Sequence, residues 1–202
     1  MRYYKFLTDQ NKGGYSGFDY TDYLPKDGQP GEWLPEIENI EICRRGYHAF
    51  EPQQILGWLN AKLYVVELRG EEIKDKEKIV AQQIRFICQV DGWNDRTARL
   101  FACWCAREVL PIFTERYPAD DRPRNAIETA ERYAVGEATD VELAAARDAA
   151  EAALRAASWA AARDARDAAS RAAARDANAR YAMHLLEMLG IEGREVKINE
   201  RT

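Results

Sequence analysis

A run of alanine between positions 144 and 182 constrains the fold of this chain more than any other feature. Its 39 residues hold 21 alanines, seven arginines and four aspartates, with neither glycine nor proline. Alanine loses no side-chain entropy in a helix and is the strongest helix former. Acid-before-base pairs four residues apart, such as Glu151 with Arg155 and Asp167 with Arg171, add to helical stability. The run is therefore predicted to be helical, and it carries few side chains that can take part in catalysis.

The sequence also marks where this helical region begins and ends. Thr139 and Glu142 have the spacing of a capping box, and Gly190 suits a C-terminal stop. A single helix over 141–189 would be roughly 70 Å long at ~1.5 Å per residue, which is too long for a compact chain of this size. We therefore expect at least one break, and the candidate positions are Ser158, Ser170 and Asn178.

Two further helices are predicted upstream of the alanine run. Asn94 or Asp95 can cap the first, and Pro111 is expected to kink that helix or divide it in two. Pro123 suits the first turn of the second helix, and Gly136 suits its end.

The first 92 residues show strand patterns instead. The predicted strands are 3–7, 40–43, 62–69 and 79–90, and for the last of these a helix is an alternative. A short helix is predicted over 52–60, and Gly70 is expected to end the third strand.

These patterns predict an α+β protein with two domains. The first is a small α+β domain over 1–92 that contains a Cys-x-x-Gly-Tyr-His-Ala turn. An all-helical, alanine-rich bundle follows over 93–190, and the tail over 191–202 is predicted to be flexible.

Composition limits the classes of function. The net charge is −5, and the arginines of the alanine run are interleaved with acids, so a nucleic-acid partner is not expected. No apolar run reaches the roughly 18 residues of a membrane span, and no secretory leader pattern is found, so we expect a cytoplasmic protein. The four cysteines and two histidines form no zinc pattern, and neither a metal nor a cofactor is predicted.

Three blocks in the second half carry a family resemblance. They are RLFACWCAR at 99–107, DRPRNAIE at 121–128 and YAVGEAT at 133–139, and the alanine run follows them. Together they resemble a family of immunity proteins associated with bacterial polymorphic toxin systems, which also occurs in phage genomes. The resemblance implies an all-helical fold that acts by binding a partner toxin, and it implies no catalytic residues.

The first half is similar to a phage-associated domain of unknown function. The shared pattern consists of CxxGYHA at 43–49, YVVELxGE at 64–71 and KIVA at 78–81. This similarity implies a protein of a phage or another mobile element, and it implies no activity.

A charged turn between the two upstream helices is the candidate partner-binding site. Asp121, Arg122 and Arg124 lie together at a predicted helix start. One interpretation is helix capping with a surface ion pair. The other is a recognition patch, because arginine is over-represented at the energetic centres of interfaces.

A second candidate site lies in the first domain. Tyr47 and His48 follow a glycine, which loosely resembles the nucleotide-contacting histidine segment of ADP-ribosyltransferase-like folds. There the histidine would bond a ribose and adjacent arginines would meet phosphates. The residues that this interpretation assigns are Arg44, Arg45, His48, Tyr15 and an acid at Glu67 or Glu71. The competing interpretation is a structural histidine that fixes a turn.

The leading hypothesis is therefore a non-enzymatic interaction protein that sequesters a toxin or a host defence component. The alternative is a nucleotide-binding or small-molecule-processing domain at 1–92, with the helices as a dimerisation module. A third possibility is that the alanine-rich helices only form homo-oligomers.

Overall fold

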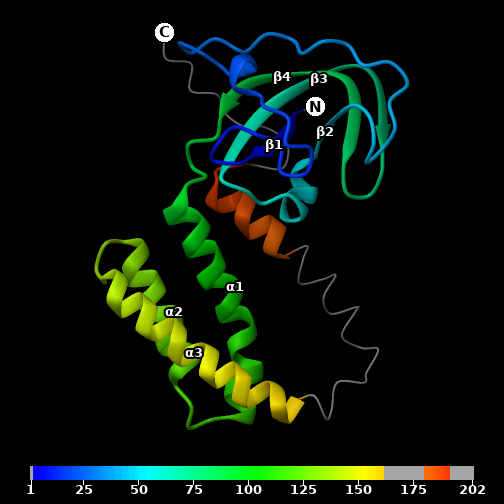
Figure 1. The fold of residues 1–202 in the computed structure, drawn as a ribbon. Helices are drawn as coiled ribbons and strands as arrows, with labels where there is room; N and C mark the ends of the chain where they lie inside the picture. The colour runs from blue at the N-terminus through cyan, green and yellow to red at the C-terminus, as the bar shows by residue number, and fades with distance from the viewer. Residues whose placement is uncertain (1, 162–179, 192–202) are drawn as a thin grey trace. The chain divides into compact units, whose positions relative to one another are not determined.

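The computed structural model describes residues 2–161 and 180–191. Contacts divide the chain into two compact units. The sheet unit comprises residues 1–94 and 178–202, and the helical unit comprises residues 95–177. Among the described residues, all strands lie in the first unit and long helices dominate the second, so the predicted α+β class is confirmed (Figure 1).

Four antiparallel strands form one sheet in the order β1-β3-β4-β2. They are β1 (Tyr3–Leu7), β2 (Tyr47–Ala49), β3 (Lys62–Lys74) and β4 (Ile79–Gln89). Two short 3₁₀ helices, η1 (Thr21–Tyr23) and η2 (Pro52–Gly57), lie in the connections.

The sheet curls until its two edge strands meet. Tyr4 in β1 and Phe50, directly after β2, exchange two backbone hydrogen bonds of 2.9 Å each. Gly70, at a φ of +87°, lies where the β3–β4 register shifts, and a bulge of this kind bends and twists a strand. The curvature therefore follows from an irregularity inside the longest hairpin.

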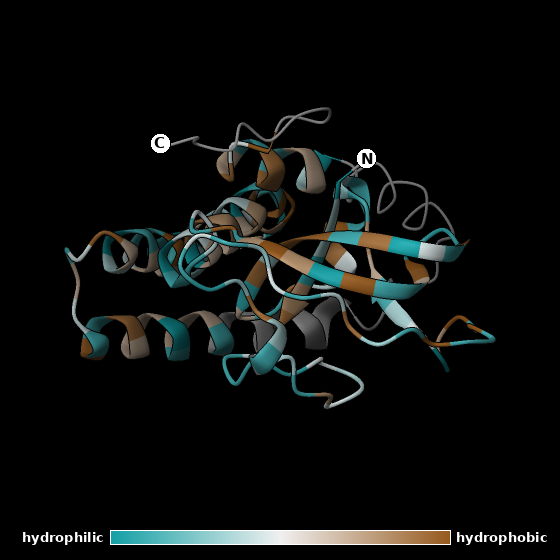
Figure 2. Cartoon of the chain, turned by 90° about the horizontal axis from the view of Figure 1, so that it is seen from above, coloured by the Kyte–Doolittle hydropathy of each residue, from teal (hydrophilic) through white to brown (hydrophobic). Residues whose placement is uncertain are grey.

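The concave face of the sheet is filled with tyrosine and aliphatic side chains. Alternation of hydrophobic and hydrophilic residues along the strands, visible in Figure 2, supplies this face. The buried cluster consists of Leu7, Tyr20, Leu34, Tyr47, Ala49, Tyr64, Val66, Ile84 and Phe86. Leu34 comes from a segment that lies along β4, where its N–H donates to the Ile84 carbonyl.

A second apolar layer belongs to the same unit. Phe6 contacts Phe50 and the ring of Trp93, at centroid distances of 5.6 and 5.4 Å. A helix over residues 180–188 buries Leu185 completely, and Gly92 approaches the backbone of Leu189. The last described helix is thus placed in the sheet unit.

The helical unit contains α1 (Asp95–Arg116), α2 (Arg122–Ala134) and α3 (Asp140–Ala161). α1 packs on α2, and α2 packs on α3. Arg107 donates from Nε and Nη2 to the two carboxylate oxygens of Glu131, at 2.7 and 2.6 Å. Arg99 lies over the ring of Tyr133, with 4.7 Å from Cζ to the centroid. The block at 99–107 therefore serves largely to join α1 to α2.

The predicted start of α3 and the predicted ends of α2 are confirmed. The backbone N–H of Thr139 donates to the Glu142 carboxylate at 2.8 Å, and the N–H of Glu142 donates to the Thr139 hydroxyl at 3.3 Å. Pro123 lies in the first turn of α2, and Gly136 follows α2 with a φ of +81°. α1 runs through Pro111 as one helix, so the division expected there as one alternative is wrong, and the kink stays a prediction.

Three strand and break predictions need correction. Residues 40–43 form a turn, not a strand, and the strand of this region is β2. Gly70 does not end its strand, because β3 continues through a bulge to Lys74. α3 continues past Ser158 to Ala161, while Ser170 and Asn178 lie outside the described residues.

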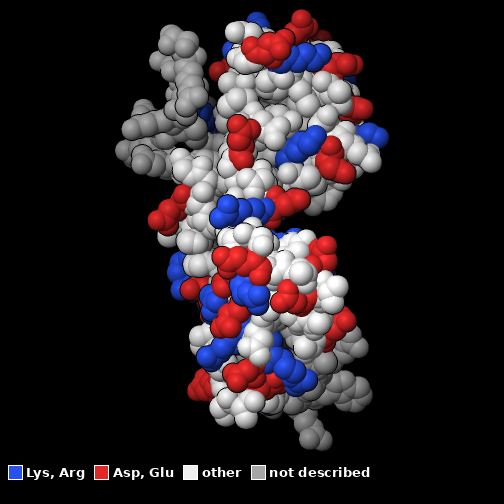
Figure 3. Space-filling view, turned by 90° about the vertical axis from the view of Figure 1, so that its left-hand side faces the viewer, with Lys and Arg blue, Asp and Glu red and all other residues white. Residues whose placement is uncertain are grey.

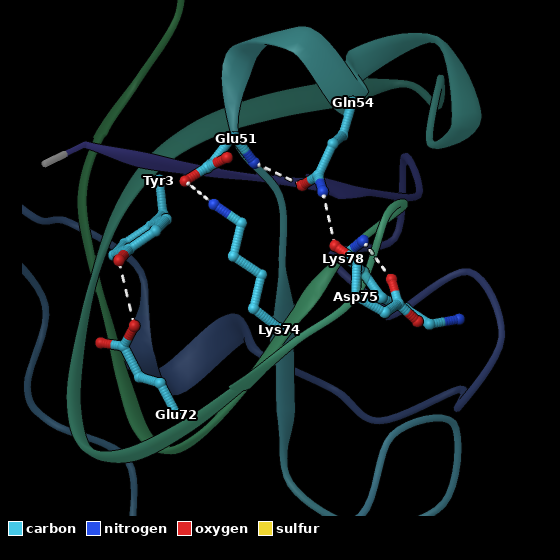
Figure 4. Close-up of polar contacts among 7 residues, drawn as sticks. All are labelled: Tyr3, Glu51, Gln54, Glu72, Lys74, Asp75 and Lys78. Carbon is cyan, nitrogen blue, oxygen red and sulfur yellow. Dashed lines mark hydrogen bonds and ion pairs between the residues drawn. The ribbon is translucent and has the colours of Figure 1, made fainter.

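A polar network holds the far end of the β3–β4 hairpin (Figure 4). The Tyr3 hydroxyl donates to Glu72 at 3.0 Å, and Lys74 pairs with Glu51 at 2.5 Å. The Gln54 side chain accepts from the N–H of Glu51, which completes a capping box of η2. These contacts tie the hairpin to β1 and η2, so its free end is fixed on both sides.

The buried amine of Lys5 should make the stability of the protein depend on pH. Its Nζ donates to the His48 carbonyl at 2.6 Å and lies 5.0 Å from the centroid of the Tyr20 ring. Burial lowers the pKa of Lys5 from 10.5 to about 8, so the folded protein disfavours the charged form. Stability should rise as pH increases from 8 to 10, because the unfolded chain then binds more protons.

Lys5→Met should therefore raise the free energy of unfolding by about 2 kcal/mol at pH 7. The charged amine costs about 3 kcal/mol, and the lost hydrogen bond offsets about 1 kcal/mol. Urea unfolding of both proteins at pH 7, 8, 9 and 10 measures this difference. A difference between wild type and variant that does not change with pH contradicts the assignment.

Candidate functional site

The connection between α1 and α2 forms a tight charged corner. Arg122, the first residue of α2, donates from Nε and Nη2 to the two oxygens of Asp120, at 2.8 and 2.6 Å. Asp120 also accepts the backbone N–H of Arg122 at 3.2 Å. The pKa of Asp120 is lowered and that of Arg122 raised, mainly because of this hydrogen-bonded pair. A two-point contact of this kind holds the guanidinium in one orientation.

The three residues predicted from the sequence lie together at this corner. Asp121 precedes α2, and its carboxylate lies 4.0 Å from Nε of Arg124. Asp121 makes no side-chain hydrogen bond to the start of the helix, so the capping interpretation lacks its main contact. The recognition role of Asp121, Arg122 and Arg124 stays a prediction.

The corner surrounds a solvent-open hollow of about 640 Å³. Its lining residues are Arg116, Tyr117, Pro118, Ala119, Asp120, Asp121, Arg122 and Asn125. Arg122 and Asp121 thus face a concave surface, while Arg124 does not line it. Fixed charges around a shallow hollow can receive a protruding polar side chain of another protein.

Tyr117 adds a feature that the sequence does not reveal. Among the described side chains, those of residues 2–151 and 180–191, its hydroxyl is the one buried polar atom without a hydrogen-bond partner. Its ring contacts Phe113, at a centroid distance of 5.0 Å. A buried hydroxyl without a partner costs free energy, so its retention next to the hollow calls for an explanation.

His48 has a structural role. It lies in β2, and its Nε2 accepts the backbone N–H of Cys43 at 3.0 Å. Burial, with Lys5 and Lys78 nearby, lowers the pKa of His48, which favours the neutral ring needed to accept this bond. Gly46 has a φ of +117°, and a Cβ there would collide with Val80. The histidine and the glycine together fix the predicted turn.

The alternative site residues are only partly gathered. Tyr15 is 89% exposed and meets Trp58 edge to face at 5.8 Å. Lys78 lies over the same Trp58 ring at 5.4 Å, and its pKa is raised chiefly by a hydrogen bond with Cys43. A chain of contacts thus leads from Tyr15 to the turn that His48 closes.

The other three alternative residues are engaged in separate contacts. Arg44 pairs with Glu41 at 3.1 Å, and Arg45 lines a separate hollow with Glu36, Ile37 and Glu38. Glu67 pairs with Arg85 at 2.6 Å. His48 faces Val80 on β4, whereas Glu67 faces Arg85, five residues further along that strand. This separates Glu67 from His48 by about 16 Å along the strand, too far for one ribose.

Exposed charges on the helices are mixed in sign. Figure 3 shows lysine or arginine side chains interleaved with acids over the helical unit on the face drawn. Within the described residues, no group of three or more His, Cys, Asp or Glu side chains is arranged to hold a metal ion. No helix in this part of the chain is long and apolar enough to cross a membrane.

Two more residues were missed by sequence reasoning. Ile112 and Val109 are 73% and 50% exposed on α1, next to the corner. Their spacing of three residues was available in the sequence, but their exposure depends on which side of α1 meets α2. Apolar residues beside an arginine-containing polar corner are typical of a protein-binding surface.

Comparison with known protein families agrees with a protein-binding surface in this part of the chain. Residues 93–188 match the model of a family described as Imm-5 like putative immunity protein. The matched segment is just under half of the 202-residue chain and includes α1, α2, α3 and the helix at 180–188. No curated protein and no solved structure matched the chain. The match supports the resemblance of this segment to an immunity-protein family.

His48→Ala should lower the free energy of unfolding by about 1 kcal/mol at pH 7.5, since the Cys43 N–H loses its acceptor. The difference between wild type and variant should shrink as pH falls below 6.5, because protonation of His48 removes the acceptor. Chemical unfolding at pH 5, 6.5 and 7.5 tests this. Arg44→Ala, on the same turn but in an exposed ion pair, should have little effect.

Tyr117→Phe should raise the free energy of unfolding by about 1 kcal/mol, because it removes a buried hydroxyl that has no partner. Tyr133→Phe is the matched control. Its hydroxyl donates to Asp140 at 2.6 Å, so that variant should gain nothing. Thermal and urea unfolding compare the two, and equal effects would refute the assignment for Tyr117.

Proposed function

We propose that this chain is a non-enzymatic, immunity-type protein whose helical unit binds and sequesters a partner protein. The observation that supports this proposal is that the segment that matches the immunity-protein family contains the charged hollow at the α1–α2 corner. The second hollow described above, lined by Glu36, Ile37, Glu38 and Arg45, lies outside that segment.

The corner suits binding by preorganisation. Arg122 is already oriented by Asp120, so less side-chain freedom is lost when a partner binds. Its remaining N–H groups can donate to a carboxylate of the partner, and Asn125 can supply a neutral hydrogen bond beside it. Asp121, on the same rim, would reject a partner that places an acid there, which gives selectivity.

The proposed partner is a toxin or a host defence component, met in the cytoplasm. A toxin gene beside this gene would favour the immunity role. A position in a phage or mobile-element operon would favour counter-defence. Self-association through the alanine run would add avidity without changing the binding surface.

Growth rescue tests the proposal directly. Each neighbouring gene would be expressed alone and together with this chain, and growth would be measured. A neighbour that stops growth alone and not in the pair identifies the partner, and purification of a one-to-one complex establishes sequestration. If no toxic neighbour is rescued, and none of the purified neighbour proteins binds the chain, the immunity role is wrong.

Arg122→Glu should abolish this rescue and weaken the complex about tenfold or more, because the two-point ion pair between Arg122 and Asp120 is replaced by two like charges. Lys76→Glu is the matched control, since it makes the same change of charge at an exposed site in the sheet unit. His48→Ala should leave rescue intact. Loss of rescue in His48→Ala, with Arg122→Glu still active, would instead favour a site in the first 92 residues.

A further inference from the structure

The outer side of α1 carries an apolar stripe that the fold does not use. Apolar residues stand at 102, 105, 109 and 112, spaced alternately by three and four residues as in one coiled-coil seam, and Arg116 follows at the same spacing. Ile112 is 73% exposed and Val109 is 50% exposed. α1 meets α2 through Arg107 and Arg99, which lie on other sides of the helix. The stripe is therefore available to another molecule.

The surroundings of Ile112 give the stripe a charge pattern. Its helical neighbours are Glu108 and Val109 on the N-terminal side and Glu115 and Arg116 on the C-terminal side. All five are exposed. Glu108 and Glu115, seven residues apart, follow one edge of the stripe. Arg116 ends the stripe and also lines the hollow at the corner.

This pattern disfavours a second copy of the chain as the occupant. Antiparallel pairing through Val109 and Ile112 would place Glu108 of one copy beside Glu115 of the other, twice over, because the interface has two-fold symmetry. Parallel pairing would bring Arg116 against its own counterpart. Both arrangements bring like charges close together beside a small apolar contact, which is unfavourable.

We propose that the outer face of α1, centred on Ile112, docks an amphipathic helix of a partner protein whose apolar stripe is flanked by lysine or arginine. The inference rests on the proposed function and names the surface and the chemistry of its partner. Apolar side chains of the partner cover Val109 and Ile112, its basic side chains meet Glu108 and Glu115, and Arg116 directs the end of the contact toward the hollow.

The test uses the full chain and two designed peptides. Both consist of three heptads with leucine at positions a and d, and they differ only in carrying lysine or glutamate at positions e and g. Like charges at these positions oppose self-association of each peptide. Binding is followed by fluorescence anisotropy of the labelled peptides.

The lysine peptide should bind the wild-type chain, and the glutamate peptide should bind about tenfold more weakly or not at all. Ile112→Asp should weaken binding of the lysine peptide about tenfold or more. Val141→Asp is its control, because Val141 is an equally exposed apolar residue on α3 (78%) and should leave binding unchanged. Glu115→Lys should shift preference toward the glutamate peptide, whereas Glu71→Lys, in the sheet unit, should not.

Equal binding of the two peptides overturns the proposal, and so do equal effects of Ile112→Asp and Val141→Asp. A wild-type dimer in sedimentation velocity that Ile112→Asp dissociates would assign the face to a second copy instead. Growth rescue is a separate measurement. Rescue without peptide binding keeps the immunity role and moves the docking surface, whereas peptide binding without rescue keeps the surface and removes the role.

Discussion

The two-point ion pair between Arg107 and Glu131 fixes how α1 and α2 meet in the helical unit. Large buried side chains are few in its described part, where Phe101, Cys103, Ile127 and Leu143 are the buried apolar residues. Helices with so small an apolar contact can slide past each other at low cost, and a two-point ion pair with fixed geometry prevents that. An exposed ion pair adds little stability, so this pair acts mainly by fixing the position of α1 relative to α2. The same pair holds the Arg107 side of α1 against α2, so the opposite side of α1 faces away from α2.

Local signals predicted the helices well because they act within a few residues. The capping box at Thr139 satisfies backbone groups of α3. Pro123 leaves no N–H unpaired in the first turn of α2, and Gly136 after that helix donates its N–H to the Tyr133 carbonyl. The strands depend on distant partners. Residues 40–43 alternate like a strand, yet β4 pairs with residues 47–49, because Gly46 and His48 end the turn there. Gly70 likewise marks a bulge whose meaning depends on β4.

The candidate site shows the same division. A cluster of Asp121, Arg122 and Arg124 is visible in the sequence, because charged residues around a proline mark a helix start. The hollow, the fork from Arg122 to Asp120 and the unpaired hydroxyl of Tyr117 depend on how α1 and α2 meet. Sequence reasoning also placed Glu67 with His48. Pairing along β4 separates them, since a strand extends about 3.3 Å per residue.

Within the described part of the helical unit, α3 and α1 therefore differ in what they can offer a partner. Alanine offers a partner no atom beyond Cβ, so an alanine-rich helix can define spacing and close packing but cannot specify which protein binds. Under the proposed function, specificity comes from the few larger side chains that the described part of the unit leaves exposed. Val135 and Val141 are exposed singly, whereas Val109, Ile112 and two glutamates share the outer face of α1, and the fixed Arg122 lies at its junction with α2. When only a few side chains determine binding, the chemistry of each one matters. Substitution of one of these exposed side chains should therefore change which partner binds more readily than it disturbs the fold.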